Sequence, residues 1–208
     1  ILFTSGSTGA PQPHPRTFGQ LAQSARSEAQ GLGLLNQAAA IVGTVPAQHS
    51  FGFESTFLLA LHGGCSFWSG KPFYPQDIVE ALSAVPAPRM LVTTPFHLAA
   101  LVGSGLHLPA LEMILSATAP LKSSLAFEAE ACAAAPVHEI YGSTETSALA
   151  TRRTTEGQTW TLLSGVTLRQ DDEDTWACGG HVPSCVGLSD VVELTGDRQF
   201  LLHGRQAD

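Results

Sequence analysis

Apolar segments of strand length alternate with helical segments from about residue 40 to residue 145, and this alternation limits the fold more than any other feature. The expected strands are 38–46, 65–70, 89–95, 111–120 and 137–145, and the expected helices are 54–64, 75–85, 96–105 and 123–135. Such alternation predicts parallel strands joined by right-handed crossovers. Strand sequences that are apolar throughout, such as AIVGTV, fit a sheet covered on both faces. We therefore expect an α/β fold with a parallel sheet flanked by helices.

The pattern changes after about residue 148. Segments 159–170, 189–194 and 198–204 alternate apolar and polar residues as strands do, and turn-forming sequences such as DDEDT and TGD separate them. A small antiparallel β unit is expected here. The chain would then consist of an α/β subdomain (1–147) and a small β-rich subdomain (148–208).

Charge and hydropathy exclude several classes of protein. The net charge is -8, from 10 basic and 18 acidic residues, and the basic residues are scattered, which argues against a nucleic-acid partner. No apolar run is long enough to span a membrane, and the start lacks the basic region of a signal peptide. We expect a cytoplasmic protein. Both ends look cut, so we also expect a fragment of a longer protein.

The four cysteines are expected to be ordinary reduced thiols, as is usual in a cytoplasm. Cys178, His181 and Cys185 are close enough in sequence to suggest a metal site. However, no CxxC pair is present and a fourth ligand is not evident, so the spacing is a poor zinc signature.

The sequence FTSGSTGAP near the start combines glycines and hydroxyls in the way that a phosphate-binding loop does. Gly6 and Gly9 let backbone amides approach an anion closely, and the hydroxyls of Thr4, Ser5, Ser7 and Thr8 are further donors. The loop is not a Walker loop, because GxxxxGK[ST] is absent. On SGSTG alone, a plain surface turn is equally compatible. The apolar strand before the loop and the proline after it favour a phosphate loop.

A second motif, YGSTE, ends the strand expected at 137–145. Glu145 offers a carboxylate, and Mg²⁺ typically takes one or two protein oxygens together with substrate phosphates. Tyr141 offers a flat face for a purine ring. Taken alone, the motif could also be a simple turn between a strand and a helix.

Together, FTSGSTGAP and YGSTE resemble signatures of the acyl-adenylating superfamily, which contains acyl-CoA synthetases, nonribosomal peptide adenylation domains and luciferases. The segments VPAQHSFG, TTPFHLAAL and SATAPL, between the two motifs, resemble further family segments in the right order. The resemblance implies a fragment of the large domain of an adenylate-forming enzyme. It also implies which residues form each part of the site. The phosphates would be bound by Thr4, Ser5, Gly6, Ser7, Thr8 and Gly9, and the adenine by Thr118, Ala119, Pro120 and Tyr141. The resemblance assigns catalysis to Thr144 and Glu145, with Glu145 also holding the metal, and the acyl pocket to His49, Phe53 and Phe96.

Some of these assignments leave alternatives open. His49 could gate the acyl pocket or be a polar loop histidine, and His97 could line the same pocket or lie on a helix surface. For the ribose, Asp197 lies in the sequence TGD, but Asp190 stands fifteen residues before Arg205 of the GR pair, as the family aspartate does. The resemblance therefore assigns ribose binding to Asp190 and Arg205.

The chain departs from the family at three points. Gln12 stands where a lysine usually follows the phosphate loop, which removes a charge-assisted contact of roughly 1.5–3 kcal/mol, although Arg16 could compensate. Ala207 stands at the hinge position, where Asp or Lys is usual. The C-terminal lid domain with its catalytic lysine, and the region before the phosphate loop, are also missing.

The implied function is activation of a carboxylic acid, aryl or fatty, by Mg²⁺ and ATP to an acyl-adenylate, with transfer to coenzyme A or an acyl carrier protein. The sequence is somewhat similar to ligases of aryl-polyene or pigment clusters. A degenerate member that binds nucleotide or acyl chains without catalysis is one alternative, and Gln12 favours it. An unrelated α/β binding domain is the other.

Overall fold

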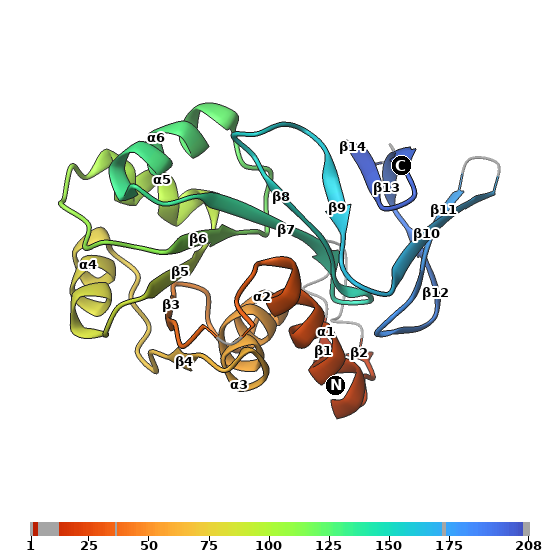
Figure 1. Ribbon diagram of the computed structural model, residues 1–208, viewed down its shortest axis with the longest axis horizontal. Helices are drawn as coiled ribbons and strands as arrows, with labels where there is room; N and C mark the ends of the chain where they lie inside the picture. Colours follow the sequence, from red (N-terminus) through yellow and green to blue (C-terminus); the bar gives the residue numbers. More distant parts are fainter. Residues whose placement is uncertain (1, 4–12, 36, 172–173, 206–208) are drawn as a thin grey trace.

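The computed structural model describes residues 2–3, 13–35, 37–171 and 174–205, and within them a nine-stranded sheet organises the molecule (Figure 1). Its strands, in spatial order, are β13 (Asp190–Gly196), β14 (Gln199–Arg205), β9 (Trp160–Leu162), β8 (Ser147–Arg153), β7 (Val137–Ser143), β6 (Met113–Ser116), β5 (Arg89–Thr93), β3 (Ala40–Gly43) and β4 (Ser66–Phe67). A three-stranded sheet contains β10 (Val166–Asp171), β11 (Asp174–Gly179) and β12 (Val182–Leu188), and β1 (Leu2–Phe3) pairs with β2 (Pro13–His14).

The strands from β4 to β7 run parallel, and this confirms the predicted α/β class. Successive residues of these strands point to opposite faces, as the period of a strand requires. Ala40 and Val42 belong to one hydrophobic core, whereas Ile41 belongs to the other. Two separate cores explain why these strands are apolar throughout.

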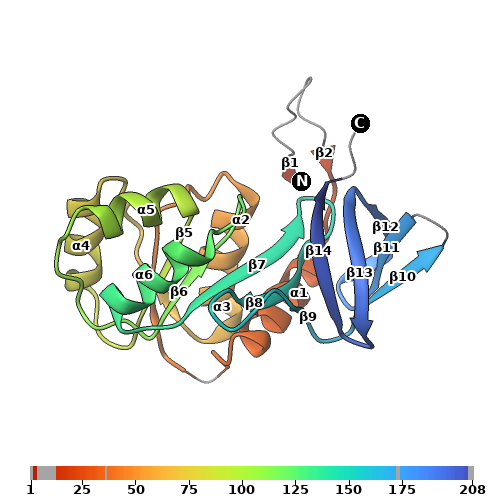
Figure 2. The ribbon, with the colours of Figure 1, turned by 90° about the horizontal axis from the view of Figure 1, so that it is seen from above.

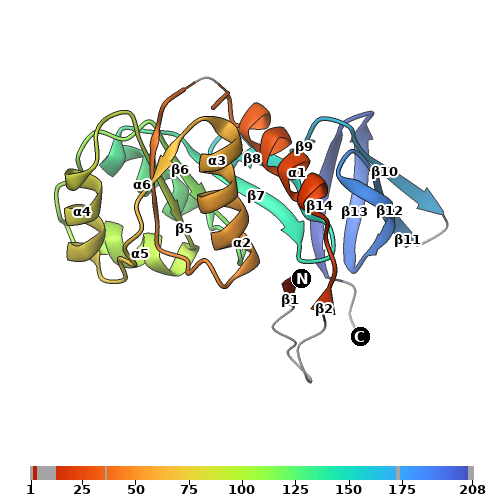
Figure 3. The same ribbon diagram turned by 90° about the horizontal axis from the view of Figure 1, so that it is seen from below.

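Helices cover both faces of this parallel part (Figures 2 and 3). The helices are α1 (Phe18–Gly31), α2 (Ser50–Gly52), the π-helix η1 (Phe53–Leu58), α3 (Leu59–Gly63), α4 (Pro75–Ala84), α5 (Pro95–Gly103) and α6 (Ser123–Ala133). Residues of α4, α5 and α6 line one core, and residues of α1, α2 and α3 line the other.

Helix α1 is absent from the helices predicted above, and its composition explains why. Its buried face carries Ser24, Ser27 and Glu28 beside two alanines, so it lacks an apolar stripe. Its beginning is nevertheless well defined, because Thr17 and Gln20 form a reciprocal capping box. The helix expected at 54–64 also differs, since it begins at Ser50 and contains the π-helix η1. Such π turns inside helices are frequent at functional sites.

Beyond β7 the large sheet continues with antiparallel strands. The three-stranded sheet packs against these strands through a third core, which includes Val166, Ala177 and Val182 from the small sheet and Trp160 and Phe200 from the large one. The predicted antiparallel β unit is thus present, with four of its strands extending the large sheet. A subdomain boundary at 147/148 stays a prediction.

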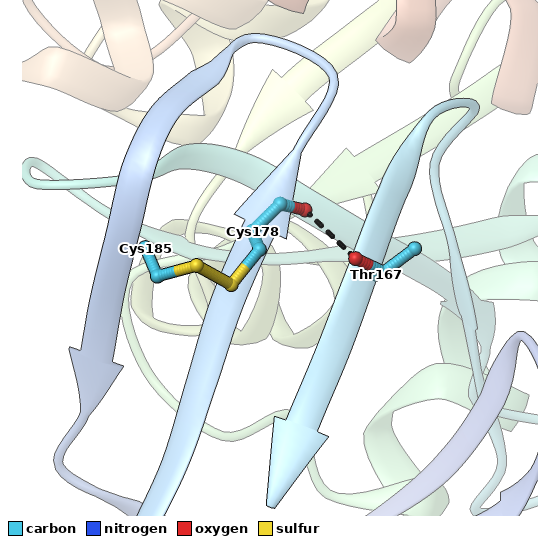
Figure 4. The surroundings of a disulfide bond; sticks show 3 residues. All are labelled: Thr167, Cys178 and Cys185. Atoms are coloured by element: carbon cyan, nitrogen blue, oxygen red, sulfur yellow. Dashed lines mark hydrogen bonds between the residues drawn. A yellow bond between two sulfur atoms is a disulfide. The ribbon is translucent and has the colours of Figure 1, made fainter.

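The prediction that all four cysteines are unpaired is wrong for one pair. Cys178 on β11 and Cys185 on β12 form a disulfide, and the carbonyl of Cys178 accepts a hydrogen bond from the Thr167 hydroxyl on β10 (Figure 4). The hairpin pairing of β11 and β12 brings two positions seven residues apart face to face. Cys65 and Cys132 are free thiols. Within the described part of the chain, no helix is both long and apolar enough to span a bilayer.

Candidate active site

The YGSTE motif forms the tip of the β7–β8 hairpin, and we call residues 143–147 the Glu145 turn. The Ser143 amide donates to the Thr146 hydroxyl (3.0 Å), which in turn donates to the Ser147 carbonyl (2.9 Å). Gly142 is required next to the turn, because any side chain there would collide with the Ser147 carbonyl oxygen. Ser147 itself has a φ of 60°, which a non-glycine residue adopts at a cost and which is frequent at functional sites.

The segment that follows the predicted phosphate loop lies against the Glu145 turn. His14 Nε2 is 3.5 Å from Glu145 Oε1, and Arg16 Nη1 donates to the Glu145 carbonyl oxygen at 2.6 Å. The loop residues Thr4, Ser5, Gly6, Ser7, Thr8 and Gly9 lie outside the described residues. The strands on either side of the loop are paired, with Phe3 opposite Pro13, so both ends of the loop lie together. Figure 2 shows β1 and β2 beside the end of β7 that carries the turn.

The predicted ribose ligand Asp190 lies near the same turn. Its carboxylate Oδ2 accepts a hydrogen bond of 2.8 Å from the Tyr141 hydroxyl. Asp190 and Arg205 are direct partners in the β13–β14 register, whereas Asp197 lies beyond β13 in the turn at the other end of that hairpin. A cleft of about 340 Å³ is lined by Tyr141, Ser143, Glu145 and Asp190.

The predicted adenine segment follows β6, the neighbour of β7. Thr118, Ala119 and Pro120 are exposed, and Thr118 has a φ of 79° in the left-handed region. The segment is held at its end, where the buried Glu139 carboxylate accepts a hydrogen bond from the Leu121 amide. The Tyr141 ring packs on Trp160 and Phe200, with centroids 5.7 Å away in both cases. The adenine assignment of these residues stays a prediction.

The three residues predicted for the acyl pocket fall into two groups. His49 begins α2, where its Nδ1 accepts a hydrogen bond from the Phe51 amide (3.2 Å), and Phe53 stacks on Phe57. Phe96 is 72% exposed on α5 and contacts the ring of His97 instead. No ring contact among the described residues joins Phe96 to Phe53. His97 is half-buried, burial lowers its pKa, and Thr94 Oγ1 is 2.9 Å from its Nδ1.

Two buried acids were missed from the sequence: Glu54, beside the Glu145 turn, and Glu28, beside Glu54. Glu54 on η1 and Glu28 on α1 are 5% and 0% exposed. Burial raises the pKa of Glu54 to about 7, and the Ser147 hydroxyl and the Arg16 guanidinium oppose this rise. Burial likewise raises the pKa of Glu28 to about 8, against a smaller opposing effect of the nearby Ser55 hydroxyl. An acid inside an apolar run, as Glu54 is in FGFESTFLLAL, was the one available signal.

The residues at the turn fit a magnesium ion. The Glu145 side chain is 37% exposed beside the cleft, and the Thr144 hydroxyl is next to it in sequence, 3.5 Å from the Ser50 hydroxyl. A single carboxylate suits Mg²⁺, which keeps several waters and binds mainly through substrate phosphates. Among the described residues, no three His, Cys, Asp or Glu side chains gather into a complete protein cage for a metal.

The sequence of residues 1–187 matches the family of AMP-binding enzymes. The chain belongs to the AMP-binding enzyme family. This confirms the resemblance drawn from FTSGSTGAP and YGSTE, and it removes the alternative of an unrelated α/β domain.

Two curated relatives are similar in sequence to this chain, over different shares of their own length. The chain is 31% identical to a 4-coumarate–CoA ligase of Rhodobacter capsulatus, over 99% of this chain and 51% of the ligase. It is 33% identical to a 2-succinylbenzoate–CoA ligase of Staphylococcus epidermidis, over 70% of this chain and 30% of that protein. The chain thus spans about half of the first relative and less of the second.

Solved structures show the same fold. Apo MatB from Rhodopseudomonas palustris superposes with a TM-score of 0.84 at 18% identity, over 100% of this chain and 48% of MatB. The O-succinylbenzoate coenzyme A synthetase MenE from Bacillus subtilis, in complex with AMP, superposes with a TM-score of 0.81 at 20% identity, over 100% of this chain and 49% of MenE. At these identities the likeness shows the fold alone, and it confirms that this α/β arrangement matches about half of each of these two proteins.

Proposed function

We propose that this chain is the nucleotide-binding part of an adenylate-forming ligase, which activates a carboxylic acid with ATP and transfers the acyl group to a thiol. Family membership and the names of the relatives, which are CoA ligases, support the proposal. The alternative is a member of the family that binds nucleotide or acyl chains without catalysis, which Gln12 in place of the usual lysine favours.

One observation supports the proposal most strongly: the segment that follows the phosphate-loop motif lies against the YGSTE motif, about 130 residues away in sequence. His14 and Arg16, which follow the phosphate-loop motif, both contact Glu145. A phosphate-binding loop and a magnesium-holding carboxylate would serve the same ligand, because Mg²⁺ is usually held by one or two carboxylates together with substrate phosphates. A turn with a purely structural role would not require this contact with the segment that follows the phosphate loop.

The proposed reaction has two steps. An oxygen of the substrate carboxylate attacks the α-phosphorus of ATP, the bond from that phosphorus to the bridging oxygen breaks, and pyrophosphate leaves with its electron pair. The thiol, after losing its proton, then attacks the acyl carbonyl carbon, and AMP leaves. The protein contributes positioning and neutralisation of charge around the phosphates.

Each proposed residue then has a distinct task. Glu145, with the neighbouring Thr144 hydroxyl, would hold Mg²⁺, which when bound neutralises phosphate charge. The hydroxyls and glycine amides of the phosphate loop would bind the phosphates. Asp190 would accept hydrogen bonds from both ribose hydroxyls, and its partner Arg205 faces it in the β-sheet register. Tyr141, which donates to Asp190, would fix the orientation of that carboxylate.

The finer parts of the proposal concern substrates and surroundings. The acid is proposed to be an aryl or fatty acid, since aromatic residues such as Phe53 lie on the helices near the site. Coenzyme A is proposed as the thiol because the relatives are CoA ligases, and an acyl carrier protein remains the other acceptor. A C-terminal lid domain would complete the machinery, and the use of ATP and coenzyme A fits a cytoplasmic location.

The test is a thermal-unfolding titration with a non-hydrolysable acyl-adenylate analogue. At 100 times its dissociation constant, the analogue should stabilise the fold by about 2.7 kcal/mol. Asp190→Ala should abolish this stabilisation, and Asp197→Ala, at the opposite end of the same hairpin, is the matched control that should retain it. The absence of any stabilisation in the unaltered chain would contradict nucleotide binding. Loss in Asp197→Ala alone would move the ribose site to that residue.

Catalysis is separated from mere binding by release of pyrophosphate. Glu145→Ala should lower the rate of acid-dependent pyrophosphate release by at least about 100-fold, the usual scale for losing one electrostatic contact to a reacting group. An unaltered protein that binds the analogue yet releases no pyrophosphate with any aryl or fatty acid would establish the degenerate alternative.

A further inference from the structure

We propose that Arg16 and Glu54 are positioning residues that hold the Glu145 turn from behind, so that the π-helix η1 and the magnesium-binding carboxylate move as one unit. This inference rests on the proposed function of Glu145. It assigns a role to two charged residues that none of the motifs contains.

Arg16 contacts three successive residues of the turn. Its Nη1 donates to the Glu145 carbonyl (2.6 Å), and its Nη2 donates to the Thr146 carbonyl (3.3 Å) and to the Ser147 hydroxyl (3.1 Å). These acceptors lie on the backbone side of the turn, so the guanidinium leaves the Glu145 carboxylate available to the cleft. The planar fork of an arginine suits such a set of acceptors better than the single ammonium group of a lysine.

Glu54 lies near enough to the Arg16 guanidinium for the two side chains to interact electrostatically. Burial lowers the pKa of Arg16, and the Glu54 carboxylate acts against this. Glu54 is buried beside the same turn, and the Ser147 hydroxyl next to it favours the charged carboxylate. The Oε2 atom of Glu54 has no hydrogen-bond partner among the described residues. Removing one member of a buried charge pair is costly because the other remains uncompensated.

Two further titratable groups face this pair. Glu28 from α1 lies close enough to Glu54 for the Glu54 carboxylate to raise the pKa of Glu28, although burial is the larger cause. His181, buried in the turn between β11 and β12, faces Arg16 and the backbone of Thr146 and Ala148, and burial lowers its pKa to about 4. At neutral pH His181 is therefore neutral, so Arg16 is the cation that lies near Glu54.

The pair connects the turn to the helix predicted to border the acyl pocket. Glu54 is adjacent in sequence to Phe53, and Ser50 on the preceding helix α2 lies 3.5 Å from the Thr144 hydroxyl. The turn is thus held at two points by the continuous segment from α2 to η1. A shift of this segment, when an acid binds against it, would be passed to Glu145 through Glu54 and Arg16.

The first test measures the turn without any ligand. Hydrogen–deuterium exchange of the peptide that contains residues 143–149 should become at least tenfold faster in Arg16→Ala and in Glu54→Gln. Arg26→Ala, an exposed arginine on α1, is the matched control and should leave the exchange unchanged. Arg16→Lys should restore protection only in part. Unchanged exchange of this peptide in Arg16→Ala would overturn the proposal.

The second test separates positioning from a general loss of stability. The double variant Arg16→Met with Glu54→Gln removes both charged groups. Its free energy of global unfolding should therefore be closer to that of the unaltered protein than the value for Glu54→Gln alone. The peptide of the turn should nevertheless still exchange fast. Where nucleotide binds, both single variants should raise the Mg²⁺ concentration that half-saturates ATP binding by about tenfold. Global destabilisation with proportionate exchange across all peptides would indicate a structural role and would also overturn the proposal. The exchange readout is independent of nucleotide, so it can fail or succeed whatever becomes of the proposed function.

Discussion

The base of the β7–β8 hairpin holds charges that neutralise one another, whereas its tip holds charges that are only partly matched. At the base, Glu139 accepts hydrogen bonds from Arg152 at 2.6 Å and from the Thr154 hydroxyl, and Glu130 pairs with Arg153 at 2.9 Å. The hydrogen bond from Arg153 is the main reason that the pKa of Glu130 is lowered to about 2.

At the tip, burial dominates instead. The pKa values of Glu54 and Glu28 rise to about 7 and about 8, and three of their four carboxyl oxygens have no hydrogen-bond partner among the described residues. Folded proteins satisfy nearly all buried polar groups, so such exceptions call for an explanation. From this difference we expect the base to stabilise the fold and the tip to serve the proposed site.

The largest effect is expected at the base. Arg152→Ala would leave the Glu139 carboxylate, only 4% exposed, without its cation, and it would also remove the cation that lies 4.5 Å from the centre of the Trp160 ring. Loss of one partner of a buried pair typically costs 3–5 kcal/mol, here expected as about 4 kcal/mol in urea-induced unfolding.

Two controls sharpen this prediction. Arg169→Ala, on the exposed face of β10, should change the free energy of unfolding by less than about 0.5 kcal/mol. The double variant Arg152→Met with Glu139→Gln removes both charges and should cost less than Arg152→Ala alone. An equal cost for single and double variants would mean that packing, rather than charge pairing, holds the base together.

The next effect concerns the pH dependence of stability at the tip. The pKa of Glu28 is raised on folding, so the folded state holds its proton more tightly than the unfolded state does. Stability contributed by this group is complete below pH 4.5 and falls as the pH rises toward about 8. Between pH 5 and pH 8 the free energy of unfolding of the unaltered protein should therefore fall by more than about 2 kcal/mol relative to that of Glu28→Gln. One unit of pKa difference corresponds to about 1.4 kcal/mol.

The measurement is urea-induced unfolding at several pH values. Glu128→Gln, on the exposed side of α6, is the matched control and should leave the pH dependence of the unaltered protein intact. If Glu28→Gln and the unaltered protein lose stability in parallel over this range, Glu28 is not the group responsible, and the comparison between tip and base would fail on this point.

The smallest effect is expected from the disulfide. Reduction of Cys178–Cys185, which are seven residues apart, should lower the free energy of unfolding by about 2 kcal/mol according to the loop-entropy relation. His181 lies inside the loop that the disulfide closes and is buried near the Glu145 turn. Hydrogen exchange should consequently rise slightly at the tip on reduction, and not at the base.

The Cys178→Ser and Cys185→Ser double variant should behave like the reduced protein and should not respond to dithiothreitol. Substituting the two free cysteines, Cys65 and Cys132, is the matched control. Equal acceleration of exchange at base and tip would show that the small sheet supports the whole hairpin rather than the turn alone.

The parallel half of the fold could be predicted because its signal is local. An apolar run such as MILSA is a strand buried on both faces, and every predicted strand of the parallel half is present, with shorter limits. Helix α1 could not be predicted in the same way, since its buried face is polar and is compensated by residues far away in sequence. The hydroxyl of Ser27, for example, lies 3.5 Å from the Ser164 carbonyl.

The sequence by itself determined the family, the order of the motifs along the chain and the place of Glu145 after a buried strand, since these depend on short patterns. Only the tertiary structure decided that Arg16 contacts the turn, that Glu54 and Glu28 are buried, and that Cys178 meets Cys185. The physical reason is that desolvation and charge pairing depend on neighbours that packing brings together. The residue type alone does not reveal whether a carboxylate will face water, an arginine or the core.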